Sequence, residues 1–448
     1  MRILAIDVGT SGVKAGYWDG RRFVVRVQVA VATTFGEGTA EIAVRGLLKA
    51  VDEAARGAME GREAPDVVAF DAFSSGVVVT DGAGKLVTNV ITHQDRRSVL
   101  EAEEIVAEFG EEWLLKHVGN LPFPGGIGSS TLRWLQRNTR VLKGEAMVGQ
   151  VSSLIGRYLT GRWVIDPSQA CFLGLMDIRR GAWCEALCDF LGVTQSMLPR
   201  IEWADEVMGM TLAGVSRRWG LRSGTPVVGG FVDTSAAVLN TPMANGQLVH
   251  SSGTTDVLAM CVNEPRPAAH LLTRPVGVGR VLPERWLSVS TMAAAGSAAM
   301  WARETLFSEM TDGAFRQALA RVCRREGRSK EQEARSKKTA GDVFCEPWFA
   351  GDRMSIAQKT ASLAGLTLGT TREEILAGIV AGLVQERARG YGELAKVHRI
   401  ERKVYTMGGA TELAGAMHDA WPRKHTFVPI EADALAGLVK LARCAMNG

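Results

Sequence analysis

Short apolar runs that alternate with polar turns open the chain and predict a β-hairpin followed by a third strand. The segments RILAID, VKAGYW and RFVVRVQVA are separated by a Gly/Ser/Thr turn and by Asp19-Gly20, a pair that favours a tight hairpin turn. An amphipathic helix is predicted over residues 43–57, followed by the strand VVAFDAF and a second hairpin around TDGAGKL. This alternation of strands and helices predicts an α/β protein.

The pattern of the opening hairpin returns half a chain later. Residues 99–220 have mostly helical periodicity, and strands and glycine pairs resume after them. There the segment LVHSSGTTDVLAM repeats the order of apolar strand, small polar turn and apolar strand, so that Gly253 corresponds to Gly9. We therefore expect two domains of similar topology, residues 1–224 and 225–448.

Composition and charge argue against nucleic acid and membranes as partners. The 448 residues carry a net charge of +4, and the main charged run, residues 321–338, mixes acidic and basic side chains. Nucleic acid is therefore not an expected partner. The seven cysteines form no CxxC pair, which fits a reducing compartment, and no apolar stretch reaches the ~20 residues of a membrane span. We expect a cytoplasmic protein without membrane contact.

The first turn combines an acid with small hydroxyl residues. Asp7 ends the first strand, and Gly9, Thr10 and Ser11 follow it. Successive backbone amides in such a turn can bind an anion, glycine permits its close approach, and Asp7 could hold Mg²⁺, usually through water. The alternative is a plain hairpin in which Asp7 accepts hydrogen bonds from turn amides. The pattern alone leaves both interpretations open.

A second acid follows the strand and glycine pair of GTPVVGGFVDTSAAVL. Asp233 precedes Thr, Ser and a helical run, which fits an ordinary helix N-cap. Its position after a strand and two glycines also suits a general base, which would accept the proton of a hydroxyl that attacks a phosphoryl group.

A third cluster lies in the segment FSSGVVVTDGAGKLVTNVITHQDRRS. Asp95 and Arg96 place an acceptor beside a forked donor, which suits the vicinal hydroxyls of a polyhydroxylated ligand. An ion pair between the two side chains that only closes a loop is the alternative. His93 could bond to the same ligand, but simple packing of its ring is slightly favoured.

Taken together, these segments resemble the FGGY family of carbohydrate kinases, which belongs to the actin-like ATPase superfamily. DVGTSGVKAG, THQDRRS, TPVVGGFVDTSAAVLN, SSGTTD and MGGATEL occur in the family's order, and weaker matches extend the likeness over nearly the whole chain. The resemblance implies an α/β protein with two ribonuclease H-like domains that flank a catalytic cleft. It also implies phosphorylation of a primary hydroxyl of a sugar or polyol with ATP and Mg²⁺.

The resemblance also assigns roles to individual residues. It implies that Asp7 and Asp233 hold Mg²⁺ and that Asp233 is the general base. The residues expected to bind the nucleotide are Gly9, Thr10, Ser11, Gly253, Thr254, Gly296, Gly409 and Ala410. The residues expected to contact the substrate are Ser75, Gly76, His93, Asp95, Arg96 and Asp233.

Departures from the family's pattern concern the substrate. Pentulose kinases usually carry Gln-Met-His-Gly in the segment that reads DAFSSG here, so Ser74 and Ser75 replace a methionine and a histidine. The smaller turn predicts a larger or differently configured substrate than D-xylulose. Glycerol kinases carry an Arg-Glu pair near the serine segment, which this chain lacks. A ketose such as a pentulose or heptulose is expected, with polyols next. The sequence leaves the oligomeric state open, a homodimer included.

Two other functional classes compete with a kinase. The first is a non-catalytic actin-like regulator that binds nucleotide, which would often lose the general base, whereas Asp233 is present. The second is an ATPase that drives a conformational change in another enzyme, as dehydratase activators do. That class needs cysteines in a shared iron–sulfur motif, and the scattered cysteines argue against it. The kinase is therefore the favoured interpretation.

Overall fold

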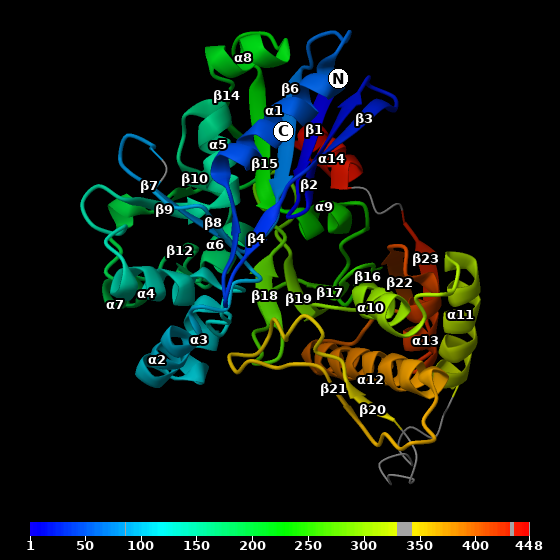
Figure 1. Ribbon diagram of the computed structural model, residues 1–448. Helices are drawn as coiled ribbons and strands as arrows, with labels where there is room; N and C mark the ends of the chain where they lie inside the picture. Colours follow the sequence, from blue (N-terminus) through cyan, green and yellow to red (C-terminus); the bar gives the residue numbers. More distant parts are fainter. Residues whose placement is uncertain (86, 329–342, 431–433, 448) are drawn as a thin grey trace. The chain divides into compact units, whose positions relative to one another are not determined.

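Two compact units make up the chain in this computed structural model, which describes residues 1–85, 87–328, 343–430 and 434–447 (Figure 1). The first unit contains Met1–Met243, Val262–Leu287 and Asp433–Gly448. The second contains Ala244–Cys261 and Ser288–Ala432. The units group residues differently from the predicted domains 1–224 and 225–448, and that domain division stays a prediction.

The first unit is a mixed α/β structure. Its strands are β1 (Ile3–Val8), β2 (Gly12–Trp18), β3 (Phe23–Ala30), β4 (Thr33–Phe35), β5 (Ala40–Ile42), β6 (Val67–Ala72), β7 (Gly76–Thr80), β8 (Val90–Thr92), β9 (Met147–Gln150), β10 (Val164–Ile165), β11 (Met176–Asp177), β12 (Ala182–Trp183), β13 (Arg200–Ile201), β14 (Val207–Met210), β15 (Pro226–Val232) and β18 (Leu272–Pro275). Its helices are α1 (Val44–Met59), α2 (Val99–Phe109), α3 (Glu111–Val118), α4 (Gly128–Asn138), α5 (Val151–Thr160), α6 (Pro167–Leu173), α7 (Glu185–Phe190), α8 (Ala213–Trp219), α9 (Asp233–Leu239) and α14 (Ala434–Asn447), with a 3₁₀ turn at Gln195–Met197.

The main sheet of the first unit has the strand order β14-β15-β6-β1-β2-β3. β1 pairs with β2 in antiparallel fashion, as the opening hairpin predicts, and it runs parallel to β6, which in turn runs parallel to β15. A second sheet, β4-β5-β8-β7-β9, carries the serine segment, residues 74–76, before β7 and the segment of Asp95 after β8. In the main sheet, the carboxyl ends of the parallel strands β1, β6 and β15 therefore lie side by side.

Alternation along the strands explains how this sheet is covered. Leu4, Ile6 and Val8 face a buried cluster with the apolar side of α1, which confirms the helix predicted over residues 43–57. The C-terminal helix α14 packs against β1, β6 and α9 (Figure 1). Residues of odd number in β1, such as Asp7, project from the face opposite to the α1 cluster.

The second unit repeats this topology. Its strands are β16 (Leu248–Ser252), β17 (Asp256–Val262), β19 (Trp286–Met292), β20 (Phe344–Glu346), β21 (Ser362–Ala364), β22 (Lys403–Met407) and β23 (Thr426–Pro429). Its helices are α10 (Gly296–Leu306), α11 (Asp312–Arg328), α12 (Arg372–Val397) and α13 (Thr411–Asp419). The order β19-β17-β16-β22-β23 matches β3-β2-β1-β6-β15, again with an antiparallel hairpin followed by parallel strands. The two units thus share this strand order.

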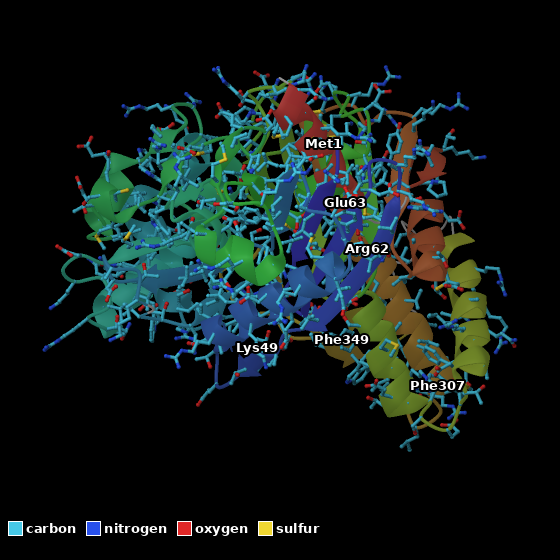
Figure 2. All side chains as sticks on the ribbon, turned by 90° about the horizontal axis from the view of Figure 1, so that it is seen from above. Met1, Lys49, Arg62, Glu63, Phe307 and Phe349 are labelled. Atoms are coloured by element: carbon cyan, nitrogen blue, oxygen red, sulfur yellow. The ribbon has the colours of Figure 1, made fainter. Side chains whose placement is uncertain are left out.

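An apolar cluster joins the helices of the second unit. Phe307, which is labelled in Figure 2, is fully buried and packs with residues of α10, α11, α12 and α13. The charged run 321–338 forms the end of α11 as far as Arg328, and its residues 329–338 lie outside the described residues. Within the described part of the chain, no helix is long and apolar enough to cross a membrane.

Candidate functional site

The turn between β1 and β2 has the form that the sequence predicts. The backbone N–H of Gly9 donates to the carbonyl oxygen of Gly12 at 3.0 Å, and the N–H of Val31 donates to the carbonyl of Ser11 at 3.0 Å. Thr10 is half-buried and Ser11 is exposed. The hydroxyl groups of this turn therefore lie at the surface of the first unit, where a ligand can reach them.

Two aspartates end neighbouring parallel strands beside this turn. Asp7 on β1 is the direct partner of Asp71 on β6, so the two side chains project from the same face of the sheet. Asp7 is also paired with Lys14 on β2, whose Nζ lies 3.3 Å from Oδ2 of Asp7. Asp71 was missed by sequence reasoning, although VVAFDA shows the same strand-into-acid pattern as ILAID.

The environment of Asp71 disfavours its charged form. The side chain is fully buried, and among the described residues neither carboxylate oxygen has a hydrogen-bond partner. Burial first, and then the negative charges of Asp7 and Asp233, raise the pKa of Asp71 well above its usual value, while Lys14 opposes the shift. The environment of Asp71 therefore favours the neutral form of its carboxyl group.

Asp233 begins α9 directly after β15. It does not cap the helix, because Val232 is the N-cap residue and Asp233 is the first helical residue. Its Oδ1 accepts a hydrogen bond from the backbone N–H of Thr234 at 2.6 Å, and the residue is half-buried. The acid thus lies at the carboxyl end of β15, next to the strand that carries Asp71.

A buried arginine fixes the first turn of α9. Arg274 donates to the hydroxyl oxygens of Thr234 and Ser235, each at 2.6 Å, and the guanidinium is almost fully buried. Burial lowers the pKa of Arg274 to about 10, while the charges of Asp233 and Asp166 oppose the shift. Sequence reasoning missed Arg274, because its contact with α9 joins segments 40 residues apart.

Side chains at the start of α6 form hydrogen bonds to the ends of β6 and β15. Asp166 caps this helix, and the hydroxyl of Ser168 donates to Asp166 Oδ1 at 2.7 Å and accepts from the N–H of Val232 at 3.1 Å. The side-chain amide of Gln169 donates to the carbonyl of Ala72 at 2.9 Å. These bonds hold the segments that carry Asp71 and Asp233 in a fixed relation.

The serine segment is braced by a glutamine that sequence reasoning also missed. Oε1 of Gln150 accepts from the N–H of Gly76 at 2.6 Å, and its Nε2 donates to the hydroxyl of Ser75 at 3.3 Å. Ser75 is buried, and so is His93, whose burial agrees with the packing role favoured for its ring. The role of Ser75, Gly76 and His93 in substrate binding stays a prediction.

Asp95 is committed to contacts within the protein. Its carboxylate accepts from the backbone N–H of Ala40 at 2.9 Å and from the guanidinium of Arg97, whose Nη2 lies 2.7 Å from Oδ2. Arg97 also pairs with Glu41 at 2.5 Å, and Arg96 donates instead to the carbonyl of Pro124. The ion-pair partner of Asp95 is thus Arg97, and the expected joint role of Asp95 and Arg96 stays a prediction. Asp95 and Arg97 close the loop after β8, and substrate contact by Asp95 stays untested.

In the second unit, the turn between β16 and β17 is held against the start of α10. The N–H of Gly253 donates to the carbonyl of Thr255 at 2.9 Å, and the N–H of Gly296 donates to the carbonyl of Gly253 at 2.9 Å. The hydroxyl of Ser297 donates to the carbonyl of Thr254 at 3.0 Å, while the residue Thr254 itself is exposed. A Cβ atom at Gly296 would lie 2.5 Å from the carbonyl oxygen of Gly253, so this approach requires glycine.

A third segment of the second unit joins this turn. Gly408 has a φ of +101°, and a Cβ atom there would collide with the carbonyl oxygen of Ser252. The N–H of Ala410 donates to the same carbonyl at 3.1 Å. Gly409 and Ala410 therefore lie beside the strand end that leads into Gly253, and the predicted nucleotide residues of this unit gather in one place.

A buried ionic network supports the hairpin of the second unit. Asp256 follows the turn, and its carboxylate lies 2.8 Å from Nε2 of His250 and 3.0 Å from Nη1 of Arg387. Burial would raise the pKa of Asp256, but His250 and Arg387 outweigh it and hold the pKa well below the usual range. Nδ1 of His250 lies 2.7 Å from Nε2 of His418, so the network reaches α13.

The acids of the first unit fit a hard divalent cation. Carboxylate oxygens are the donors that Mg²⁺ prefers, and the oxygens of Asp71 lack a partner within the described residues. Among those residues, no group of three or more His, Cys, Asp or Glu side chains is arranged to hold a metal ion directly. Mg²⁺ usually takes only one or two carboxylates and keeps several waters, so a pair of acids suffices.

Comparison with known proteins agrees with this architecture. The chain is 25% identical over 343 residues to a glycerol kinase of Thermococcus gammatolerans, a match that covers 75% of this chain and 65% of the relative. The chain thus spans just under two thirds of that relative's length.

Solved structures share the fold over the whole chain. A xylulose kinase of Rhodospirillum rubrum has a TM-score of 0.84 at 21% identity, covering 100% of this chain and 90% of that one. A glycerol kinase of Plasmodium falciparum, solved with ADP, has a TM-score of 0.82 at 17% identity, covering 100% and 90%. At these identities the likeness shows the fold alone.

Two family domains are found along the sequence. Residues 2–240 match the N-terminal domain of the FGGY family of carbohydrate kinases, and residues 248–418 match its C-terminal domain. The protein belongs to the FGGY family of carbohydrate kinases.

Proposed function

We propose that the protein is an ATP-dependent kinase that phosphorylates a primary hydroxyl of a sugar or polyol, with a ketose such as a pentulose or heptulose as the favoured class. Membership of the FGGY family supports the reaction type. The observation that carries the proposal is Asp233, a half-buried carboxylate at the carboxyl end of β15, next to the strand that carries Asp71.

Asp233 is the proposed general base. As the substrate hydroxyl attacks the terminal phosphorus of ATP, a carboxylate oxygen of Asp233 accepts its proton, and ADP leaves. Arg274 fixes the start of α9 through Thr234 and Ser235, so the carboxylate keeps its place. Such positioning matters because phosphoryl transfer depends mainly on alignment and charge stabilisation.

Asp7 and Asp233 are the proposed holders of Mg²⁺. When bound, the cation neutralises charge on the phosphate oxygens of the nucleotide. Lys14 lies 3.3 Å from Asp7, so its ammonium group orients that carboxylate, and the amides and hydroxyls of Gly9, Thr10 and Ser11 would bind phosphate oxygens.

The second unit is proposed to bind the rest of ATP. The exposed Thr254 and the backbone of Gly253 would contact phosphate oxygens, since a short turn presents adjacent N–H groups to an anion. Gly296, Gly409 and Ala410 would border the adenosine. The three segments that carry these residues are hydrogen-bonded to one another, which supports a preformed nucleotide site.

The substrate is proposed to contact the serine segment of the first unit. Ser75 and Gly76 are bound to Gln150, and the segment carries no imidazole where pentulose kinases usually have one. We therefore expect D-xylulose to be a poor substrate. A polyol is the second candidate, because the relatives above include glycerol kinases. A non-catalytic nucleotide-binding regulator is the competing class, and the retained Asp233 counts against it.

A coupled assay of ADP release tests the proposal. The purified protein would be screened with MgATP against ketoses, polyols, aldoses and aldonic acids, and each hit would be confirmed by phosphorus NMR of the product. We expect sugar-dependent ADP release with at least one ketose or polyol. Tight ATP binding without any acceptor-dependent turnover over the whole panel would instead support the regulator.

A further inference from the structure

Asp71 is a buried acid that neither the proposed base nor the proposed turn explains. Its side chain is fully buried, and both of its carboxylate oxygens lack hydrogen-bond partners within the described chain. Buried polar groups are nearly always bonded, and a lone buried carboxylate is costly unless a proton or a cation neutralises it. Either a proton or a bound cation can therefore stabilise the carboxyl group of Asp71.

The sheet places Asp71 between the two acids already assigned to the cation. On one side, Asp71 is in register with Asp7 of β1, and on the other side β6 borders β15, which leads into Asp233. Val68, Phe70 and Ala72 of β6 face the cluster with α1, so the alternation of the strand sends Asp71 to the same face as Asp7. Asp7 and Asp71 thus lie one residue before the ends of β1 and β6, and Asp233 directly follows the end of β15.

The nearby basic groups are engaged elsewhere. Lys14 Nζ lies 3.3 Å from Asp7, and Arg274 donates to Thr234, Ser235 and its neighbouring carbonyl at Pro275. Among the described residues, the carboxylate of Asp71 accepts no hydrogen bond from either basic side chain, although such a group would be the ordinary partner of a buried acid. A divalent cation at the face that Asp7 and Asp71 share would supply the missing charge.

We infer that Asp71 is a further oxygen ligand of the divalent cation, bound together with Asp7 either directly or through one water. Two carboxylates with water completing the shell are a usual set for Mg²⁺ and agree with the lack of a direct three-ligand group in the described residues. The inference rests on the proposed kinase function. It adds that the first unit binds the cation before any nucleotide is present.

Cation binding without nucleotide is the direct test. Mn²⁺ would be titrated into the nucleotide-free protein and followed by electron paramagnetic resonance, with the melting temperature in Mg²⁺ compared with that in potassium chloride of equal ionic strength. The variants are Asp71→Asn, which removes the charge at nearly constant volume, and Asp52→Asn as a control. Asp52 is a carboxylate of the same unit that bonds to Tyr158 and Trp219.

We expect the wild-type protein and Asp52→Asn to bind Mn²⁺ with equal affinity and to gain melting temperature in Mg²⁺. Asp71→Asn should bind Mn²⁺ at least about tenfold more weakly, since changes even to groups behind the ligands cost about 10–100-fold. Its melting temperature without metal should not fall below that of wild type, because an unpaired buried acid has been removed. Wild-type affinity in Asp71→Asn, or no Mn²⁺ binding by the wild-type protein at millimolar concentration, would overturn the inference.

A second measurement does not depend on the folding of the variant. Crystals of the wild-type protein soaked in Mn²⁺ should show anomalous density next to the carboxylate of Asp71, and density beside Asp7 alone would contradict the inference. The kinase proposal is tested separately by acceptor-dependent ADP release. A protein that binds Mn²⁺ through Asp71 but phosphorylates nothing would refute only the proposed function, and an active kinase with unchanged Mn²⁺ affinity in Asp71→Asn would refute only this inference.

Discussion

The guanidinium of Arg274 lies 2.6 Å from the hydroxyl oxygen of Thr234, the residue that directly follows Asp233. This contact joins a buried positive charge in β18 to the start of the helix that carries the proposed base. It makes the position of Asp233 depend on a residue that does not itself have to touch the substrate.

Replacing this arginine should therefore cost both stability and rate. Arg274→Met leaves the hydroxyls of Thr234 and Ser235 without their donor. It also removes the positive charge that balances the negative charge of buried Asp166. We therefore expect a loss of about 3–5 kcal/mol in the free energy of unfolding. Urea denaturation measures it. Arg217→Met, at an exposed arginine of α8, should change that free energy by less than about 0.5 kcal/mol. Equal effects of the two substitutions would show that the buried contact is unimportant.

Gly296→Ala should disturb the nucleotide side of the second unit. The added methyl group would lie 2.5 Å from the carbonyl oxygen of Gly253, so the turn or α10 must shift at a cost of about 1–3 kcal/mol. ATP affinity, measured by titration calorimetry, should fall with it. Gly313→Ala is the matched control, because nothing lies within 4 Å of a Cβ atom at that helical position. Its expected effect is neutral or slightly stabilising. Unchanged ATP affinity in Gly296→Ala would remove this turn from the site.

Thr254→Glu should weaken ATP binding without unfolding the protein. Thr254 is exposed, so the new side chain meets water in the free protein, but its charge would repel the phosphates of the nucleotide. Thr10→Glu in the first unit should act in the same direction. Ser308→Glu places the same charge on an exposed residue beyond the far end of α10 and should leave ATP affinity unchanged. If all three variants bind ATP alike, neither turn contacts the phosphates.

The half-buried His418 of α13 predicts an acid-sensitive fold. Burial is the main cause that lowers the pKa of His418 from 6.5 to about 3. The charge of His250 lowers the pKa further, whereas the charge of Asp256 opposes the shift. Below about pH 6.5 the unfolded chain therefore binds a proton that the folded chain does not. The free energy of unfolding should fall by up to about 1.4 kcal/mol for each pH unit between 6.5 and 4. His418→Gln should flatten this slope in denaturation curves taken across that range, and parallel slopes would contradict the assignment.

Local patterns predicted much of the fold. The opening hairpin, α1 and the repeated strand-turn-strand unit follow from short-range alternation and turn residues, and the two sheets have the matching strand order that the likeness of Gly9 and Gly253 suggested. Such signals lie within a few residues of one another, which is why the sequence alone reveals them.

Contacts between distant segments explain what sequence reasoning missed. Asp71 meets Asp7 only because β6 lies beside β1, and Gln150 reaches Gly76 across 74 residues. Asp95 has a further partner that local sequence did not suggest. Its partner is Arg97, two positions on, and that pair closes a loop with Glu41. Pairings of this kind are set by tertiary packing and leave little trace in local composition.

The most direct test of the account is the turnover of Asp233→Asn on a substrate found in the screen. The amide keeps the shape of the carboxylate but cannot accept the proton, so kcat should fall by about 10²–10⁴-fold while ATP affinity, measured by calorimetry, stays at the wild-type value. A variant that binds ATP normally and phosphorylates the substrate at the wild-type rate would contradict the central claim that Asp233 is the catalytic base.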